Sequence, residues 1–250
     1  MAGHSKWANI KHRKGAQDKK RAKQFTRVIK EITVAVKDTG NTDPDTNPAL
    51  RNAIANAKGV NMPKDTLQRA IKKASGADAD NYELVTFEGY GPQGIAIFVE
   101  CRTDNTNRTV ASVRSIFTKG GGSLGTNGSL EYLFEHKGAF VLEKENIEKD
   151  KETLELELIE GGATEIEDND DVWVIYTEFS DFGLMSECLE KLDIEPKNAE
   201  LQRIPLNTTE LPLEDAKKIM NLIENFEDDD DVQSVYHTLE ITDELIEAMD

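Results

Sequence analysis

The N-terminal segment carries the residues best suited to contact a polyanion. Its first thirty positions hold ten Lys or Arg against one acid, Asp18. Trp7 lies among small and basic residues, where it could stack on an unpaired base or pack against a neighbouring helix. Cations at this density bind phosphates and release their counterions. The candidate phosphate contacts are Lys6, Lys11, His12, Arg13, Lys14, Lys19, Lys20, Lys23, Arg27 and Lys30.

Charge is divided unevenly along the chain. Residues 1–76 contain 17 basic and 6 acidic side chains, a net charge of +11, whereas residues 77–250 contain 13 and 42, a net charge of −29, and the two sum to −18. The acidic remainder repels the phosphates that the basic end attracts, so a polyanion should be held at one end of the protein. The predicted partner is nucleic acid.

A second, smaller basic cluster follows a polar turn further along the chain. Asn107 and Arg108 lie where a strand is predicted to turn into a helix, and Arg114 and Lys119 follow on that helix. Either Thr106 or Asn107 could serve only as the helix cap. Alternatively, the amides and the guanidinium at the positive end of the helix bind a phosphate or a base edge.

Several segments lack the full pattern of the sites they resemble. His4 and His12 have no cysteine nearby, and Cys101 and Cys188 have no CxxC spacing, so we expect neither a zinc site nor a disulfide framework. The glycine-rich stretch 120–128 lacks the Lys-Ser/Thr ending of a nucleotide P-loop, and we interpret it as a flexible loop or, alternatively, as bare backbone approaching RNA. The acidic run 227–231 lacks EF-hand spacing and is predicted to be a solvated loop.

No established catalytic motif occurs, so we expect no enzyme and no cofactor. The start of the chain has no apolar segment of the secretory type, and no stretch of about 18 apolar residues suits a membrane span. We expect a cytoplasmic protein without membrane contact, and a monomer is favoured.

The elements that position these residues change type near residue 77. Apolar residues recur at helical spacing from Gln17 to Val36, with the basic residues predicted on the opposite face. Further helices are predicted at 47–59, with Asn47-Pro48 as its start, and at 63–76. Beyond residue 77, period-two strands alternate with helices, which predicts an α+β fold. Strands are expected at 85–87, 95–101, 130–134, 139–142, 172–176 and 232–236, and helices at 110–117, 154–159, 184–192 and 216–226.

Six stretches give the chain a resemblance to a known family. They are MAGHSKWANIKHRKGAQDKKRAKQFTRVIKEIT, NMPKDTLQRAI, FEGYGPQGIAIFVE, TDNTNRTVASVR, KGGGSLGTNGSLEYLF and, near the end, DDDDVQSVYH. With these the chain resembles the YebC family, which includes a mitochondrial activator of the translation of cytochrome c oxidase subunit I. Phe87 stands where many members have Tyr, and residues 137–205 carry little of the signature.

The resemblance implies a multi-domain α+β protein in which a three-helix domain precedes two ferredoxin-like domains. The implied boundaries are 1–77 for the basic arm and helical domain, 78–136 plus 206–250 for a discontinuous α+β domain, and 137–205 for an inserted ferredoxin-like domain. It also implies a non-enzymatic regulator of gene expression. Members are described both as transcriptional regulators and as ribosome-associated factors that help translation through proline-rich stretches.

Three hypotheses follow for the function. The leading one is a translation factor that binds ribosomal RNA or tRNA on the ribosome. The alternative is a DNA-binding transcriptional regulator, against which the third helix offers few base-reading residues beyond Gln68 and Arg69. A third hypothesis is an acidic protein-binding adaptor, which the acidic body would suit and the basic arm would not.

Overall fold

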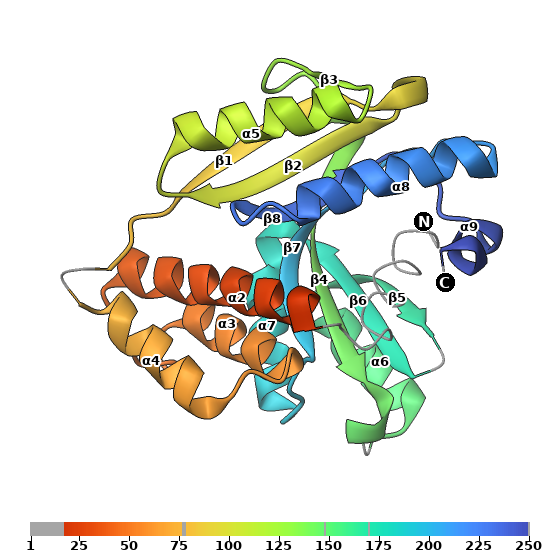
Figure 1. The fold of residues 1–250 in the computed structure, drawn as a ribbon. Coiled ribbons are helices and arrows are strands. Elements are labelled where there is room, and N and C mark those ends of the chain that lie inside the picture. The colour runs from red at the N-terminus through yellow and green to blue at the C-terminus, as the bar shows by residue number, and fades with distance from the viewer. Residues whose placement is uncertain (1–17, 77–78, 148, 170, 250) are drawn as a thin grey trace. The chain divides into compact units, whose positions relative to one another are not determined.

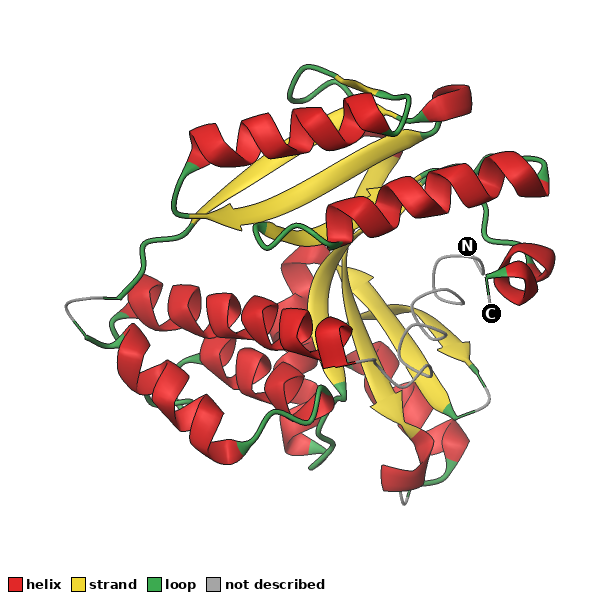
Figure 2. Cartoon of the chain, viewed as in Figure 1, coloured by secondary structure: helices red, strands yellow, loops and turns green. Residues whose placement is uncertain are grey.

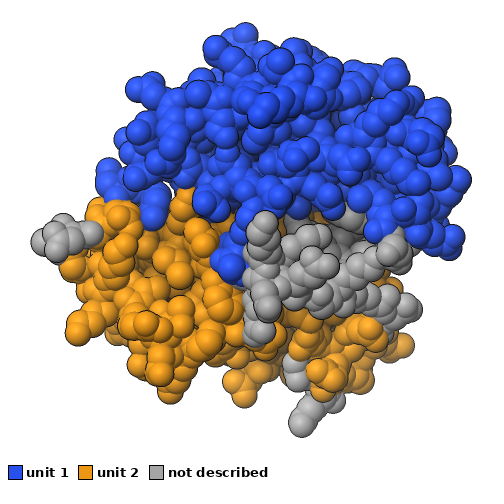
Figure 3. Space-filling view, in the orientation of Figure 1, with its two compact units in different colours: residues 1–23, 81–135, 204–250 blue, residues 24–80, 136–203 orange. Residues whose placement is uncertain are grey.

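The computed structural model describes residues 18–76, 79–147, 149–169 and 171–249. These residues form two compact units, which Figure 3 shows in two colours. Unit 1 contains the described parts of 1–23, 81–135 and 204–250, and unit 2 contains those of 24–80 and 136–203. Each unit therefore combines segments that are distant in the sequence.

The helical part of unit 2 is built from three helices (Figure 1). They are α2 (Asp18–Thr39), whose first residues are grouped with unit 1, α3 (Pro48–Gly59) and α4 (Lys64–Ala74). Their shared core includes the fully buried Ile32 and Leu50. Asn47 caps α3 as predicted, because its Oδ1 accepts from Leu50 N at 3.1 Å. Its Nδ2 donates to Ala35 O at 2.9 Å, which ties the start of α3 to α2.

The rest of unit 2 is a sheet with two helices. Its strands lie in the order β5-β6-β4-β7, the order of a ferredoxin-like β-α-β-β-α-β domain. Phe140 and Ile175 on the sheet pack against Leu154, Leu158 and Met185 of the helices. The elements are β4 (Phe134–Glu143), α6 (Lys151–Glu160), β5 (Ala163–Asp168), β6 (Val172–Glu178), α7 (Phe182–Lys191) and β7 (Asn198–Pro205), with short 3-10 turns η3 (Lys144–Asn146) and η4 (Phe179–Asp181).

Unit 1 is a second sheet, with the order β3-β1-β2-β8. β1 and β2 form an antiparallel hairpin in which Val85 pairs with Cys101 and Phe87 with Val99. Helices α5 and α8 cover one face, as Figure 2 shows, and meet through Phe117 and Phe226, whose ring centroids are 4.7 Å apart. The elements are β1 (Glu83–Tyr90), η1 (Pro92–Gly94), β2 (Ala96–Thr103), α5 (Thr106–Lys119), β3 (Ser123–Leu124), η2 (Glu131–Leu133), α8 (Leu213–Glu227), β8 (Val232–His237) and α9 (Asp243–Ala248).

The predicted fold class, α+β with N-terminal helices followed by two sheets, is confirmed. The strand predicted over 130–134 is wrong, because η2 occupies most of it and β4, which starts at Phe134, belongs to the other sheet. Strands β3, β5 and β7 and helix α9 were not predicted. β5 reads ATEIED, which offers too few apolar residues for a clear alternation. The division into three domains stays a prediction.

Candidate nucleic-acid interface

Helix α4 presents one stripe of polar and basic side chains. Between Pro48 and Gly76 the chain has six basic residues and one acid. Ala70 and Ala74 of α4 are buried in the core. The exposed positions recur every four residues, so they share the opposite face. They are Lys64, Asp65, Gln68, Arg69, Lys72 and Lys73.

Three cations of this stripe form no ion pair with the described part of the chain. Among the described residues, Lys64, Arg69 and Lys72 have no carboxylate within ion-pair distance. By contrast, Lys73 Nζ lies 2.6 Å from Asp80 Oδ2. Arg51 of α3 is also neutralised, because its Nη1 lies 2.6 Å from Glu190 Oε2 of the same unit. Helix α4 therefore carries three exposed cations that have no ion pair within the described part of the chain.

The guanidinium of Arg69 is held by its own helix. Its Nε donates to Asp65 O at 3.1 Å and its Nη2 to Thr66 Oγ1 at 3.3 Å. Because a guanidinium has five N–H donors, the others can still reach a ligand from a fixed position. Arg69 and the neighbouring Gln68 are side chains of the kind that read base edges, whereas Lys72 suits a phosphate.

The sequence-predicted arm is only partly described. Lys6, Trp7, Lys11, His12, Arg13 and Lys14 lie outside the described residues, and for Lys19 and Lys20 only the helical backbone is described.

Further along α2 the predicted exposed face is wrong at Lys30. Lys23 and Arg27 are half-buried, and only 5% of the surface of Lys30 is exposed. The reason is that α2 is covered on more than one face, where Thr33 is buried too and Glu31 Oε2 accepts from Asn56 Nδ2 of α3 at 3.1 Å.

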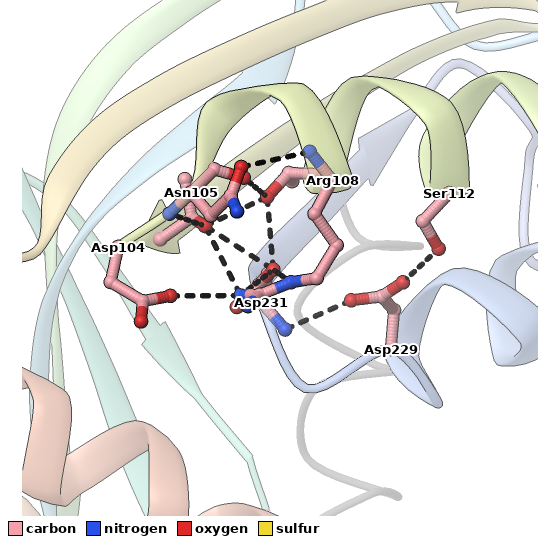
Figure 4. A network of polar contacts seen from close by, with 8 residues as sticks. Asp104, Asn105, Arg108, Ser112, Asp229 and Asp231 are labelled. Carbon is pink, nitrogen blue, oxygen red and sulfur yellow. Dashed lines mark hydrogen bonds and ion pairs between the residues drawn. The ribbon is translucent and has the colours of Figure 1, made fainter.

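In the second predicted cluster, Asn107, Arg114 and Lys119 are exposed on α5, but Arg108 is held within unit 1. Arg108 Nη2 lies 2.8 Å from Asp231 Oδ2 and 2.9 Å from Asp104 Oδ1 (Figure 4). Hydrogen bonds from the guanidinium to Asp231, and then to Asp104, raise the pKa of Arg108 above its ordinary value. The interpretation of Arg108 as a phosphate contact therefore competes with an existing ion pair.

The helix cap beside this cluster is Asn105, and neither Thr106 nor Asn107. Asn105 Oδ1 accepts from Arg108 N at 3.1 Å. Thr106 and Asn107 already have helical geometry, so Asn105 is the residue in the extended conformation that a cap requires.

The acidic run 227–231 is not wholly a solvated loop, so that prediction is wrong at its last residue. Asp231 is buried, and its Oδ2 accepts from Thr109 Oγ1 at 2.9 Å and from Thr103 Oγ1 at 3.3 Å. Asp229 accepts from Ser112 Oγ of α5, as Figure 4 shows. These bonds tie the start of β8 to the first turns of α5.

The glycine-rich stretch 120–128 is anchored by Glu88, a residue that sequence reasoning missed. Glu88 is buried, its carboxylate accepts from the backbone N–H groups of Gly128 and Leu130, and its carbonyl accepts from Gly125 N at 2.7 Å. A Cβ on Gly122 would lie 2.4 Å from Tyr90 O. Close backbone packing therefore explains this glycine. The signal in the sequence was an acid that directly follows the apolar strand residues Val85 and Phe87.

Comparison with known proteins identifies the family. Residues 5–77 match the family model of the TACO1/YebC protein N-terminal domain, and residues 82–239 match that of the TACO1/YebC second and third domain. The chain belongs to the TACO1/YebC family. The resemblance stated from the sequence motifs is thereby confirmed.

Relatives within the TACO1/YebC family align over nearly the whole chain. A protein of Amoebophilus asiaticus (strain 5a2) is 53% identical over 241 residues, covering 96% of this chain and 98% of the relative. One of Tolumonas auensis is 49% identical over 253 residues, covering 100% of both. Both are named probable transcriptional regulatory protein.

A solved relative has the same fold. The crystal structure of a conserved hypothetical protein, Aq1575, from Aquifex aeolicus matches with a TM-score of 0.78 and 39% identity, covering 90% of this chain and 93% of that one. Among the described residues, no helix combines the length and the apolar composition that crossing a bilayer requires.

Proposed function

We propose that the protein is a nucleic-acid-binding regulator of gene expression whose basic arm and helical segment together contact the nucleic acid. The observation that carries the proposal is the α4 stripe, where Lys64, Arg69 and Lys72 have no ion pair with any described residue, in a chain of net charge −18. Cations left free in so acidic a protein favour a polyanionic ligand and confine it to one surface.

The preferred target is structured RNA of the translating ribosome, either ribosomal RNA or tRNA, in a role that eases synthesis through proline-rich sequences. This finer proposal is supported by the family resemblance, which includes a translational activator. It also suits the charge pattern, because a short basic surface beside an acidic one can bind a defined site on a large RNA while the acidic part stays away from the phosphates.

DNA is the second candidate target, and two observations favour it. Relatives are named probable transcriptional regulatory proteins. In addition, α3 and α4 are joined by four residues, Val60 to Pro63, a connection length typical of helix-turn-helix motifs. In that geometry Gln68 and Arg69 would face base edges in a major groove.

The test compares the full chain with the triple variant K64Q/R69Q/K72Q. Binding to purified ribosomes and to a mixed-sequence DNA duplex is measured by sedimentation and fluorescence anisotropy between 50 and 200 mM salt. For the true target, we expect the variant to reduce the slope of log K against log salt by about 2–3, since each lost phosphate contact removes about 0.9. K191Q/K217Q/K218Q removes the same charge from other helices and is the matched control.

The outcomes separate the hypotheses. Ribosome binding that exceeds duplex binding and depends on α4 supports the translation proposal. Tighter binding to selected DNA sequences than to ribosomes supports transcriptional regulation. An unchanged slope in the α4 variant would contradict the proposed contact, and a chain that binds neither polyanion would favour the protein-binding adaptor.

A further inference from the structure

Four side chains of α4 line an open hollow on the surface of the helical part of unit 2. The hollow has a volume of about 450 Å³, and its lining residues are Asp65, Gln68, Arg69 and Lys72. These positions follow one another at i, i+3, i+4 and i+7, which is the spacing of one helix face. Small-ligand sites are typically about 300–1,000 Å³, so the hollow is large enough for one nucleobase.

Asp65 differs in charge from the rest of this lining. It is exposed on the stripe proposed to bind a polyanion, where a carboxylate repels phosphates. An Asp and an Arg four residues apart on a helix commonly pair, but the guanidinium of Arg69 bonds instead to Asp65 O and to Thr66 Oγ1. No cation of the described chain forms an ion pair with the Asp65 carboxylate. The hollow therefore presents an anionic acceptor beside a cationic donor.

The ligand of an ionised carboxylate must offer hydrogen-bond donors, which phosphates lack. Guanine is the base whose Watson–Crick edge has two adjacent donor groups, N1–H and N2–H₂, next to the acceptor O6. Adenine and cytosine offer one amino group on that edge, and uracil offers one N–H group. In the major groove of a duplex, guanine displays only the acceptors N7 and O6, so the carboxylate suits a guanine that is not base-paired.

We propose that the α4 hollow binds an unpaired guanine of the target RNA. The Asp65 carboxylate accepts from N1–H and N2–H₂ of the base, Arg69 donates to O6, and Lys72 contacts a neighbouring phosphate. Recognition of RNA sequence mostly uses unstacked bases of single-stranded loops in this way. The inference rests on the proposed function, because it names the base that the α4 stripe reads, and it favours an RNA loop over a DNA duplex.

The test measures the affinity of the full chain for fluorescein-labelled RNA hairpins by anisotropy at low salt. The hairpins differ at one position of an otherwise all-uridine loop, which is guanosine, inosine, adenosine, cytidine or uridine. We expect the guanosine hairpin to bind about tenfold more tightly than those with adenosine, cytidine or uridine, the discrimination of a good bidentate contact. Inosine lacks the N2 amino group and should give an intermediate affinity.

D65N should abolish the guanosine preference without weakening binding to the all-uridine hairpin, because it removes a negative charge from the surface. D45N removes another exposed acid of unit 2, outside α4, and is the matched control that should keep the preference. An acid in the first turn of a helix also interacts favourably with the helix dipole. That role alone would change thermal unfolding and leave the choice of base unchanged.

The outcomes separate this inference from the proposed function. The guanine site is overturned if the wild type prefers another base or none, or if D65N keeps the guanosine preference. The α4 contact itself still stands in those cases, provided that K64Q/R69Q/K72Q weakens binding to every hairpin. If the wild type binds no hairpin, or if the triple variant binds like the wild type, the proposed contact of α4 with RNA is overturned as well.

Discussion

Asp231 and Glu88 are carboxylates that unit 1 buries with different partners. Asp231 is neutralised by the Arg108 guanidinium and also accepts from two threonine hydroxyls. Glu88 instead accepts from backbone N–H groups of the glycine-rich stretch. Both satisfy the requirement that a buried charge be paired or fully hydrogen-bonded.

Removing Asp231 should destabilise unit 1. We expect D231A to lower the free energy of unfolding by about 2–3 kcal/mol, because two hydroxyls and part of a guanidinium lose their acceptor in a mostly buried site. D104A is the matched control: Asp104 and Arg108 are each more than half exposed, so its loss should cost under about 1 kcal/mol. Urea unfolding of both variants measures the difference. Equal effects would show that the network around Asp231 contributes no more than a surface pair.

Asp168 provides a test of pH dependence in unit 2. Hydrogen bonds from Lys144 and then Lys151 lower the pKa of Asp168 from 3.8 to about 2. A carboxyl whose pKa is depressed on folding adds stability above its unfolded pKa and loses it as pH falls through the folded value. The stability gap between wild type and D168N should therefore be constant above about pH 5 and shrink between about pH 4 and 2. Thermal unfolding across this range measures it, and a gap that does not change would contradict the assignment.

At the scale of elements, one side chain of helix α3 forms hydrogen bonds with the backbone of strand β7. β7 is an edge strand of its sheet, with backbone groups that no further strand pairs. Asn56 of α3 supplies the partners: its Oδ1 accepts from Ala199 N at 2.9 Å and its Nδ2 donates to Ala199 O at 3.1 Å. The helical segment thereby covers part of the sheet edge.

Replacing Asn56 should weaken the contact between α3 and β7 and lower the free energy of unfolding. N56A leaves a buried N–H and a buried C=O of Ala199 without partners, so we expect it to cost about 1–3 kcal/mol. The amide of Ala199 should also exchange faster with solvent, which hydrogen exchange resolves. N52A, which loses only a 3.5 Å contact between Asn52 and Ser186, is the comparison variant and should have little effect. If the Ala199 amide of N56A exchanges as slowly as in the wild type, the contact between α3 and β7 does not depend on the Asn56 side chain.

The sequence predicted the elements with strong periodicity and missed those whose pairing is distant. Helices α3, α4, α5 and α8 follow from apolar spacing and, for α3, from its cap. The strand at 232–236 was predicted, but its place in the sheet was not, because β8 pairs with β2 across 131 to 140 residues of chain. The exposed face of α4 follows from the spacing of its apolar residues. The burial of Lys30 depends on neighbouring elements, which a helical wheel of α2 alone does not show.

At the scale of the whole molecule, unit 2 contains both a basic surface and an acidic segment. The same compact unit contains the basic α4 stripe and the acidic segment 137–203. A nucleic acid bound to α4 would thus meet attraction on one side and repulsion on another, which orients it. Salt screens both the attraction and the repulsion, so the orientation of the bound nucleic acid should be best defined at low ionic strength.

The basic arm should dominate the salt dependence of the whole protein. If the arm and α4 together make six to ten phosphate contacts, affinity should fall by about 10³–10⁵ between 50 and 200 mM salt. Replacing Lys11, Arg13, Lys14, Lys20 and Lys23 with Ala should abolish association with the target while leaving thermal unfolding nearly unchanged. Sedimentation with ribosomes measures this, with K191A/K217A/K218A as a control. Retained association would remove the arm from the mechanism.

The Asn56 contact also has a consequence for the order in which the chain is made. Asn56 and Ala199 are 143 positions apart, and the helix is translated first. A helical segment that folds early is already present when the edge strand leaves the ribosome. The strand can then be covered at once, before its open backbone meets another nascent chain on the same message.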